Sequence, residues 1–312
     1  MASTIKTILV PVDGSKHAAA AARYADSLAR RIDARVELLH AFPESPRALM
    51  ERLGNTTEQA LAGPLSSDAF KGIRKESASR AFSSARSLLL EGAVSMEEVI
   101  VDGEPAEALA EYAKNVDSPI IIMGRRGLGR VREFLVGSVS EGVILRATCP
   151  VTVISDDDVV ATSAYIVPVD GSKSALVAVR HAAGLASATG ASIHLLHVFP
   201  NTPREIPGVG GSMAELAGVG PFADESFAEL GRESAERAFK QARREIDDES
   251  IEVLDVRRGG DPATTINAYS REIGEAEIVM GRRGLSRLEA FVMGSVSRRV
   301  VHGAFCPVTV LH

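Results

Sequence analysis

Residues 8–16 read ILVPVDGSK and residues 165–173 read YIVPVDGSK, so Asp13 and Asp170 in this motif lie 157 positions apart. An offset of this length indicates a domain, because a solenoid repeat has only about 20–50 residues and cannot bury a core alone. The sequence therefore predicts the duplication of one domain, as a first unit at 1–155 and a second at 162–312, separated by an acidic stretch at 156–158. The same offset relates further landmarks: His40 to His197, Pro105 to Pro262, Gly124 to Gly281, Gly137 to Gly294 and Cys149 to Cys306.

Each unit alternates short Val- and Ile-rich runs with longer helical patterns, which is typical of a parallel sheet covered by helices on both faces. In the first helical pattern, Ala21, Tyr24, Ala25 and Leu28 recur at the spacing of one helix face. We therefore expect an α/β fold whose ligands bind beyond the carboxyl ends of the strands, where the winding direction reverses. The expected strands are 5–12, 35–41, 99–101, 119–123 and 151–154, then 165–169, 192–198, 253–256, 277–280 and 308–311.

The composition excludes several classes of protein. Of the 312 residues, 45% are hydrophobic and 24% are charged, as in globular proteins rather than disordered or fibrous ones. Aromatic residues make up 4% and the net charge is −6, which disfavours nucleic acid as a partner. The N-terminal apolar run is too short for a signal peptide or a membrane span, and two distant cysteines, Cys149 and Cys306, predict inert packing residues in a reducing compartment. We expect a cytoplasmic protein that binds neither nucleic acid nor a membrane.

A glycine-rich motif follows the fourth expected strand of each unit. Residues 121–143 read IIMGRRGLGRVREFLVGSVSEGV, and residues 278–300 read IVMGRRGLSRLEAFVMGSVSRRV. Glycine permits positive φ and a close approach of backbone N–H groups to an anion, and the GSVS that follows opens a helix whose first N–H groups favour phosphate. We interpret the motif as a phosphate site. The alternative is that its glycines only form turns and that Ser138 and Ser295 are helix N-caps.

The arginines of the motif fit the same interpretation, because they concentrate positive charge there in a chain that is acidic overall. At the end of the first strand, Asp13 and Asp170 can accept a bond from a ribose hydroxyl or, alternatively, cap the next helix. Residues 141–142 are Glu-Gly and their counterparts 298–299 are Arg-Arg, which predicts tighter nucleotide binding in the second unit. The arginines of the motif are Arg125, Arg126, Arg130 and Arg132 in the first unit and Arg282, Arg283 and Arg287 in the second.

Together, VPVDGS, the strand ends His40-Ala41-Phe42 and His197-Val198-Phe199, MGRRG with its distal GSVS, and Cys-Pro-Val before the last strand resemble the universal stress protein family. The match extends over nearly all of both units, so the chain is similar to a tandem universal stress protein. This resemblance implies a flavodoxin-like, adenine nucleotide alpha hydrolase-like sheet of about five parallel strands in each unit. It also implies ATP, with Mg²⁺, beyond the strand ends. It further implies intramolecular pairing of the units, and we expect a homodimer and an unknown protein partner.

The resemblance assigns residues to both nucleotide sites. In the first unit, Pro11, Val12, Asp13 and Ala41 would hold adenosine, and Gly124, Arg126, Gly127, Gly137, Ser138, Val139 and Ser140 would hold the phosphates. In the second unit, the corresponding residues are Pro168, Val169, Asp170, Val198, Gly281, Arg283, Gly284, Gly294, Ser295, Val296 and Ser297.

Other features leave alternatives open. His40 and His197 either border the site or are packed and hydrogen-bonded within the fold. The Gly-, Pro- and Ser-rich segments 43–75 and 200–232 are either surface excursions before a long helix or lids over the ligand.

For function, we favour an ATP-binding regulatory or sensing protein of the stress response, because the sequence offers a phosphate motif without a P-loop, nucleophile elbow or HExxH motif. The alternative is a slow ATP hydrolase or an adenylate-transferring enzyme on the same fold. In that case Asp13 and Asp170 are the carboxylates available as a base or a metal ligand. A scaffold with vestigial sites is the third hypothesis.

Overall fold

The computed structural model of the chain describes residues 5–53, 66–89, 92–125, 137–155, 161–200, 222–284 and 293–312. The chain divides into two compact units, Ile5–Val160 and Ala161–His312, and each is described here by itself. Among the described residues, no helix is long and apolar enough to cross a membrane.

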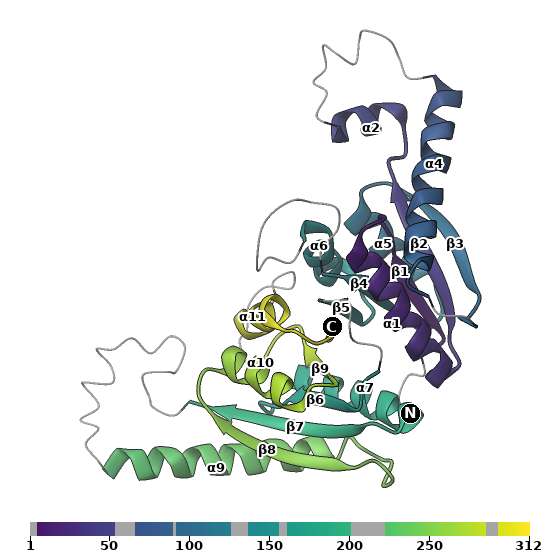
Figure 1. Cartoon of the computed structure of the whole chain (residues 1–312). Coiled ribbons are helices and arrows are strands. Elements are labelled where there is room, and N and C mark those ends of the chain that lie inside the picture. Colours follow the sequence, from purple (N-terminus) through teal and green to yellow (C-terminus); the bar gives the residue numbers. More distant parts are fainter. Residues whose placement is uncertain are drawn as a thin grey trace. The chain divides into compact units, whose positions relative to one another are not determined.

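The first unit alternates strands and helices in the order that the sequence predicts (Figure 1). Its elements are β1 (Thr7–Pro11), α1 (Lys16–Ile32), β2 (Arg35–Phe42), α2 (Pro46–Arg52), α4 (Ser67–Arg86), β3 (Met96–Asp102), α5 (Pro105–Lys114), β4 (Pro119–Gly124), α6 (Ser138–Arg146) and β5 (Val151–Ile154).

The second unit repeats this succession. Its elements are β6 (Ala164–Pro168), α7 (Lys173–Thr189), β7 (Ser192–Phe199), α9 (Phe222–Arg243), β8 (Val253–Gly259), α10 (Pro262–Ile273), β9 (Ala276–Gly281), α11 (Ser295–Gly303) and β10 (Val308–Leu311).

The strands of each unit are parallel, and the prediction of an α/β fold with about five parallel strands per unit is confirmed. The strand order is β3-β2-β1-β4-β5 in the first unit and β8-β7-β6-β9-β10 in the second. The chain winds outward from β1 to β3 and then crosses back to β4 on the other side of β1. The winding direction therefore reverses between β1 and β4, and between β6 and β9, which is where ligands bind in open α/β sheets.

The two strands at each reversal separate before they end. β1 pairs with β4 only as far as Leu9 with Ile121, although β1 stays paired with β2 as far as Pro11. In the second unit, the pairing of β6 with β9 likewise ends at Ile166 with Ile278. The residues that follow therefore no longer pair across the reversal point, where backbone and side chains can face a ligand.

Helices cover both faces of each sheet, with α1 and α4 on one face of the first unit and α5 and α6 on the other (Figure 1). The buried stripe of α1 contains Ala21, Tyr24, Ala25 and Leu28, as predicted. Alanine lets a helix lie close to a sheet, and the mainly aliphatic strands beneath it supply the rest of the core. This packing fixes the start of α1 next to the end of β4.

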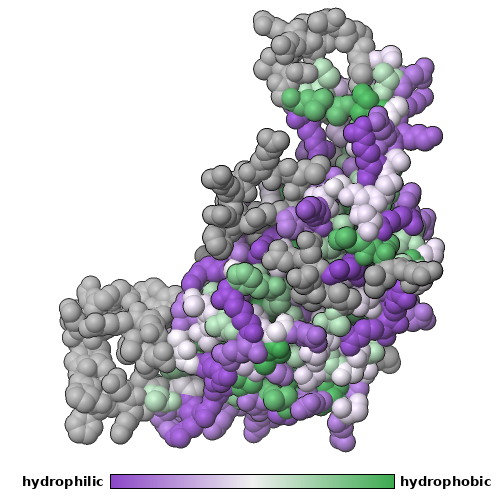
Figure 2. All heavy atoms as spheres, viewed as in Figure 1, coloured by the Kyte–Doolittle hydropathy of each residue, from purple (hydrophilic) through white to green (hydrophobic). Residues whose placement is uncertain are grey.

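The Gly-, Pro- and Ser-rich segments 43–75 and 200–232 are partly helical. α2 and α4 both begin within 43–75, so the long helix starts earlier than the sequence indicated, and α9 begins within 200–232. Residues 54–65 and 201–221 lie outside the described residues. The two alternatives, a surface excursion and a lid, concern these residues, so both stay predictions. On the face drawn in Figure 2, hydrophobic residues gather where α2 and α4 lie, and Leu53 and Ile73 are 65% and 40% exposed.

Candidate functional site

The turn after the first strand of each unit is built by its Asp-Gly-Ser sequence. Gly14 and Gly171 have φ of +86° and +80°, a conformation that glycine adopts without strain. Oδ1 of Asp13 accepts a hydrogen bond from the Ser15 N–H at 3.0 Å, and Asp170 accepts the equivalent bond at 2.9 Å. The turn therefore fixes each carboxylate at the end of its strand.

The first helix of each unit is capped by serine rather than by this aspartate. Ser15 Oγ accepts a bond from the Ala18 N–H and Ser172 Oγ accepts one from the Ala175 N–H, both at 3.2 Å. The alternative that Asp13 and Asp170 cap the helix is therefore wrong. Each aspartate lies at the end of its strand, at the reversal point of the sheet.

The glycine that ends the fourth strand is required by packing. A Cβ at Gly124 would lie 2.6 Å from Cβ of His17 and 2.7 Å from its carbonyl carbon and oxygen. A Cβ at Gly281 would lie 2.6 Å from Cβ of Ser174. No real Cβ sits so close to its neighbours, so only glycine lets the strand end pass beneath the start of α1 or α7.

The expectation of positive φ in the motif is wrong for its described glycines, because none of Gly124, Gly281 and Gly284 has it, and the φ of Gly137 and Gly294 is near −60°. Close approach is the physical reason for these glycines. At Gly284, a Cβ would lie 2.5 Å from Asp170 Oδ2, so the second unit brings the aspartate directly against the glycine-rich loop.

The ends of each glycine-rich loop are joined by the backbone and by a buried serine. The Gly137 N–H donates to the Arg125 carbonyl at 2.8 Å, and the Gly294 N–H donates to the Arg282 carbonyl at 2.9 Å. Ser140 Oγ donates to the Gly124 carbonyl at 2.9 Å, and Ser297 Oγ donates to the Gly281 carbonyl at 3.0 Å. Both hydroxyls hold the loop, so these two serines can offer an anion only their N–H groups.

The helix that follows the loop begins without a side-chain cap in either unit. Its N-cap is Gly137 or Gly294, and the first helical bonds are donated by Glu141 and Arg298. The N–H groups of 138–140 and of 295–297 precede those bonds, so they have no partner within the helix. Ser138 and Ser295 are exposed first-turn residues, and the alternative that they are N-caps is wrong.

Arginines at the base of the second loop make the strand ends electropositive. The pKa of His312 is lowered to about 4 by burial and by the charges of Arg282 and Arg283. Burial and the charge of Arg283 also lower the pKa of Arg282 itself. An anion placed at the mouth of α11 would therefore lie in a favourable field.

Several predicted site residues fall outside the described part of the chain. They are Arg126 and Gly127, together with the loop arginines Arg130, Arg132 and Arg287.

His40 on β2 and His197 on β7 are packed and hydrogen-bonded within the fold, which was one of the two alternatives for these residues. Nδ1 of His40 lies 2.9 Å from the Val12 carbonyl oxygen and Nδ1 of His197 lies 2.7 Å from that of Val169. Burial lowers the pKa of His197, so the neutral ring is favoured.

The backbone of Val12 is fully used by the fold, because its N–H also donates to the Leu39 carbonyl. The side chain of Val12 is only 3% exposed. Pro11 and Ala41 keep partly exposed surface at the same edge, as do Pro168 and Val198 in the second unit. Contacts with a base would therefore come mainly from these four residues.

The cysteines lie away from this chemistry. Both are buried, and burial raises the pKa of each thiol to about 11.

One residue that supports the loop of the second unit, Ser174, is not singled out by the sequence. Ser174 Oγ donates to the Arg283 carbonyl, which ties the loop to the first turn of α7. Arg299 forms an ion pair with Asp261, so the positive charge assigned to 298–299 is partly neutralised. Tighter nucleotide binding by the second unit stays a prediction.

The fold and the site together define the class: two doubly wound α/β domains in tandem, each with a glycine-rich loop and an uncapped helix at the reversal point of its sheet. The model of the universal stress protein family matches residues 4–155 and 165–312. The chain belongs to the universal stress protein family, and this membership supports a role in the stress response.

Individual relatives agree with this assignment. A universal stress protein of Thermus aquaticus is 34% identical over 149 residues, which are 48% of this chain and 98% of the relative. One from Mycolicibacterium smegmatis is 26% identical over 97% of this chain and 96% of its own length, so it shares the tandem arrangement. A universal stress protein structure from Archaeoglobus fulgidus has a TM-score of 0.58 at 22% identity and covers 100% of this chain and 99% of its own, which shows the shared fold.

Proposed function

We propose that each unit binds ATP with Mg²⁺ and that the chain acts as a nucleotide-dependent regulatory protein of the stress response. The observation that carries this proposal is the uncapped helix start at 138–140 and 295–297. Three backbone N–H groups without helical partners, at the positive end of a helix dipole, suit a phosphate group. The same arrangement occurs in both units, so two nucleotides per chain are expected.

The residues around the helix start support an adenine nucleotide in particular. The turn bonds fix Asp13 and Asp170 at the strand ends that also carry the partly exposed Pro11 and Ala41 or Pro168 and Val198, and a carboxylate there can accept a bond from a ribose hydroxyl. Mg²⁺ is usually held by substrate phosphates with one or two carboxylates, and Asp170 beside Gly284 is suitably charged for this. Bound Mg²⁺ would supply charge neutralisation for the phosphates.

Binding without efficient turnover fits the residues better than the hydrolase alternative. A hydrolase needs a group that activates water, and in this proposal Asp13 and Asp170, the carboxylates at the reversal point, hold ribose or Mg²⁺ instead. Both strand-two histidines are committed to backbone carbonyls. We therefore expect ATP to be recovered intact after incubation with the protein and Mg²⁺.

Replacing Ser138 or Ser295 by Asp tests the proposal at one site at a time. A carboxylate in the first helical turn stabilises the helix, so folding is preserved, but it repels a phosphate at the same N–H groups. Isothermal titration with Mg-ATP should give two nucleotides per parent chain and one per single variant, with at least about tenfold weaker binding at the altered site.

The matched controls are Ser138→Asn and Ser295→Asn, because asparagine has the size of aspartate without its charge. These variants should bind Mg-ATP within about threefold of the parent. Parent-like binding by both Asp variants would refute the helix starts as the phosphate sites. A parent chain that gives no heat with Mg-ATP and carries no nucleotide through purification, as judged by mass spectrometry, would refute ATP binding itself.

A further inference from the structure

We propose that the ion pair between Asp261 and Arg299 positions the start of α11 and so sets the nucleotide affinity of the second unit, while the first unit uses no such pair. This inference rests on the proposed function, because it concerns the same helix start. Arg299 is then a positioning residue, which acts on the ligand only through the backbone of α11.

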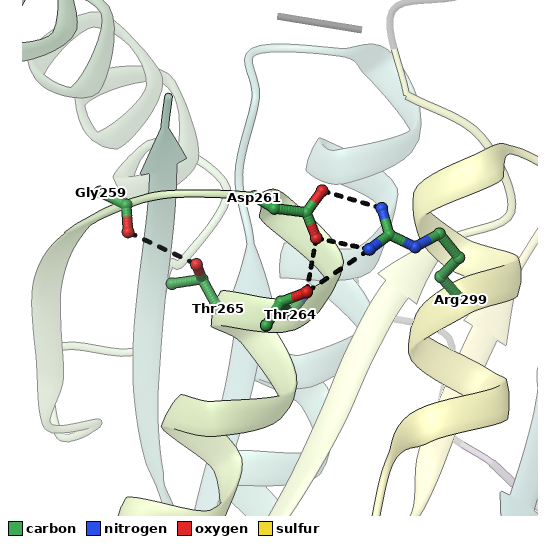
Figure 3. A network of polar contacts seen from close by, with 5 residues as sticks. All are labelled: Gly259, Asp261, Thr264, Thr265 and Arg299. Atoms are coloured by element: carbon green, nitrogen blue, oxygen red, sulfur yellow. Dashed lines mark hydrogen bonds and ion pairs between the residues drawn. The ribbon is translucent and has the colours of Figure 1, made fainter. Parts of the chain in front are cut away.

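The geometry of the pair is bidentate (Figure 3). Arg299 Nη1 donates to Asp261 Oδ2 at 2.8 Å and Nη2 donates to Oδ1 at 2.6 Å. Two parallel bonds from a planar guanidinium fix orientation as well as distance. The pair therefore links the middle of α11, one turn after its start, to the residue that precedes α10.

Asp261 is itself held firmly. It is the N-cap of α10, where Oδ1 accepts bonds from the Thr264 N–H at 3.1 Å and from Thr264 Oγ1 at 2.7 Å (Figure 3). The Arg299 guanidinium and these bonds hold the pKa of Asp261 well below its usual range. The carboxylate thus stays ionised at any pH at which the protein works, and α10 gives Arg299 a fixed anchor.

The first unit joins the equivalent helices differently. Position 142, the counterpart of Arg299, is glycine, and a Cβ there would lie 2.7 Å from Cβ of Ala106. The middle of α6 therefore lies directly against the first turn of α5. Glu104, the counterpart of Asp261, makes no side-chain cap bond with α5.

The close contact of the second unit lies at the other end of its helix. Gly303 ends α11, and a Cβ there would lie 2.7 Å from Nδ2 of Asn267, in the middle of α10. The far end of α11 is thus fixed by packing, and its middle is linked to α10 by the ion pair. The start is also held to the loop by the bonds of Gly294 and Ser297. The N–H groups proposed to bind phosphate lie within one turn of Arg299, so loss of the pair would let them shift relative to α10.

The variant Asp261→Asn tests this inference because positioning and simple electrostatics predict opposite results. Asparagine still caps α10, but it cannot hold Arg299 in a charge-assisted bidentate pair. Removing a negative charge and freeing an arginine would strengthen phosphate binding if only the field mattered. If the pair positions α11, Asp261→Asn instead weakens Mg-ATP binding, by roughly three- to tenfold.

The titration is made in the Ser138→Asp background, so that only the second site is measured. Arg299→Ala should weaken Mg-ATP binding, Arg299→Lys should recover part of the affinity, and the double variant with Asp261→Asn should be no weaker than Arg299→Ala alone. The matched control in the first unit is Glu104→Gln, measured in the Ser295→Asp background, and it should bind as its background does. Thermal unfolding of each variant separates loss of affinity from loss of folding.

The outcomes separate this inference from the proposed function. Unchanged or tighter binding by Asp261→Asn, in a background that binds Mg-ATP, overturns the positioning role and leaves the nucleotide site standing. A background without any binding at the second site overturns the proposed function there, and the positioning role with it.

Discussion

Gly124→Ala should lower the free energy of unfolding of the first unit by about 2–3 kcal/mol. The added Cβ would lie 2.7 Å from the carbonyl carbon and oxygen of His17, and these backbone atoms cannot rotate away. Relief requires the end of β4 or the start of α1 to shift, which is the overpacking that close-packed interiors resist. Thermal unfolding of the full chain should show the first unit melting roughly 5–10 °C earlier.

The chain offers two graded controls for this substitution. Gly281→Ala should cost less, because the nearest Cβ is equally close at 2.6 Å but the carbonyl carbon of Ser174 is 3.0 Å away and its Oγ can rotate. Gly72→Ala, within α4 and with nothing inside 4 Å of the new Cβ, should stabilise by about 0.5–1 kcal/mol. Gly124→Ala with parent stability would show that Gly124 serves the phosphate loop and not the packing.

The repeat made the fold accessible from the sequence. Val- and Ile-rich runs recurring in register defined the strands, and their alternation with helical stripes such as Ala21 and Leu28 defined the parallel sheet. The reversal point follows from these elements, so Asp13 and Gly124 could be placed at one edge without any coordinates. The structure confirms the fold and brings the corresponding Asp170 and Gly284 together.

The role of each motif residue was harder to predict, because one residue type satisfies several physical demands. Gly124 was expected to allow positive φ, yet the demand at that position is space for the start of α1. Ser140 is predicted to bind phosphate, and because its hydroxyl holds the Gly124 carbonyl, only its N–H group can do so. Periodicity and spacing do not distinguish these demands, since they depend on which backbone atoms lie within a few ångströms in the fold.

The pair of Asp261 and Arg299 shows a second limit. The two residues are 38 positions apart and lie on different helices, so their contact is visible only after the fold is known. The sequence did contain the signal, because the first unit has Gly142 where the second has Arg299. This difference between the units indicates a more positive electrostatic field at the second helix start. The structure shows instead that the two helices are joined in a different way.

Acidification from pH 7 to pH 5 should destabilise the second unit more than the first. The second unit contains five of the seven histidines of the chain. Burial lowers the pKa of four of them: His181 and His312, each to about 4, and His194 and His197. A histidine whose pKa is lower in the folded state is protonated first in the unfolded chain. Its contribution to stability is therefore present above the unfolded pKa, which is about 6.5, and is lost as the pH falls from there toward about 4.

His181 should contribute most of this loss. Its Nε2 is buried without a hydrogen-bond partner among the described residues, so protonation in place would leave a charge without compensation. The shift of its pKa to about 4 corresponds to a loss on the order of 3 kcal/mol once the pH is below that value. Hydrogen exchange followed by mass spectrometry assigns protection to peptides of each unit separately, and the chain contains no tryptophan whose fluorescence could do so.

The variant His181→Leu distinguishes this cause from general acid unfolding. Leucine removes the titrating group without removing a hydrogen bond, so the second unit of this variant should keep more protection at pH 5 than the parent. Because both chains carry the same carboxylates, any loss of protection that stems from carboxylate protonation appears equally in each. Equal acid sensitivity of the two units in the parent chain, or of the second unit in the two chains, would contradict histidine burial as the cause.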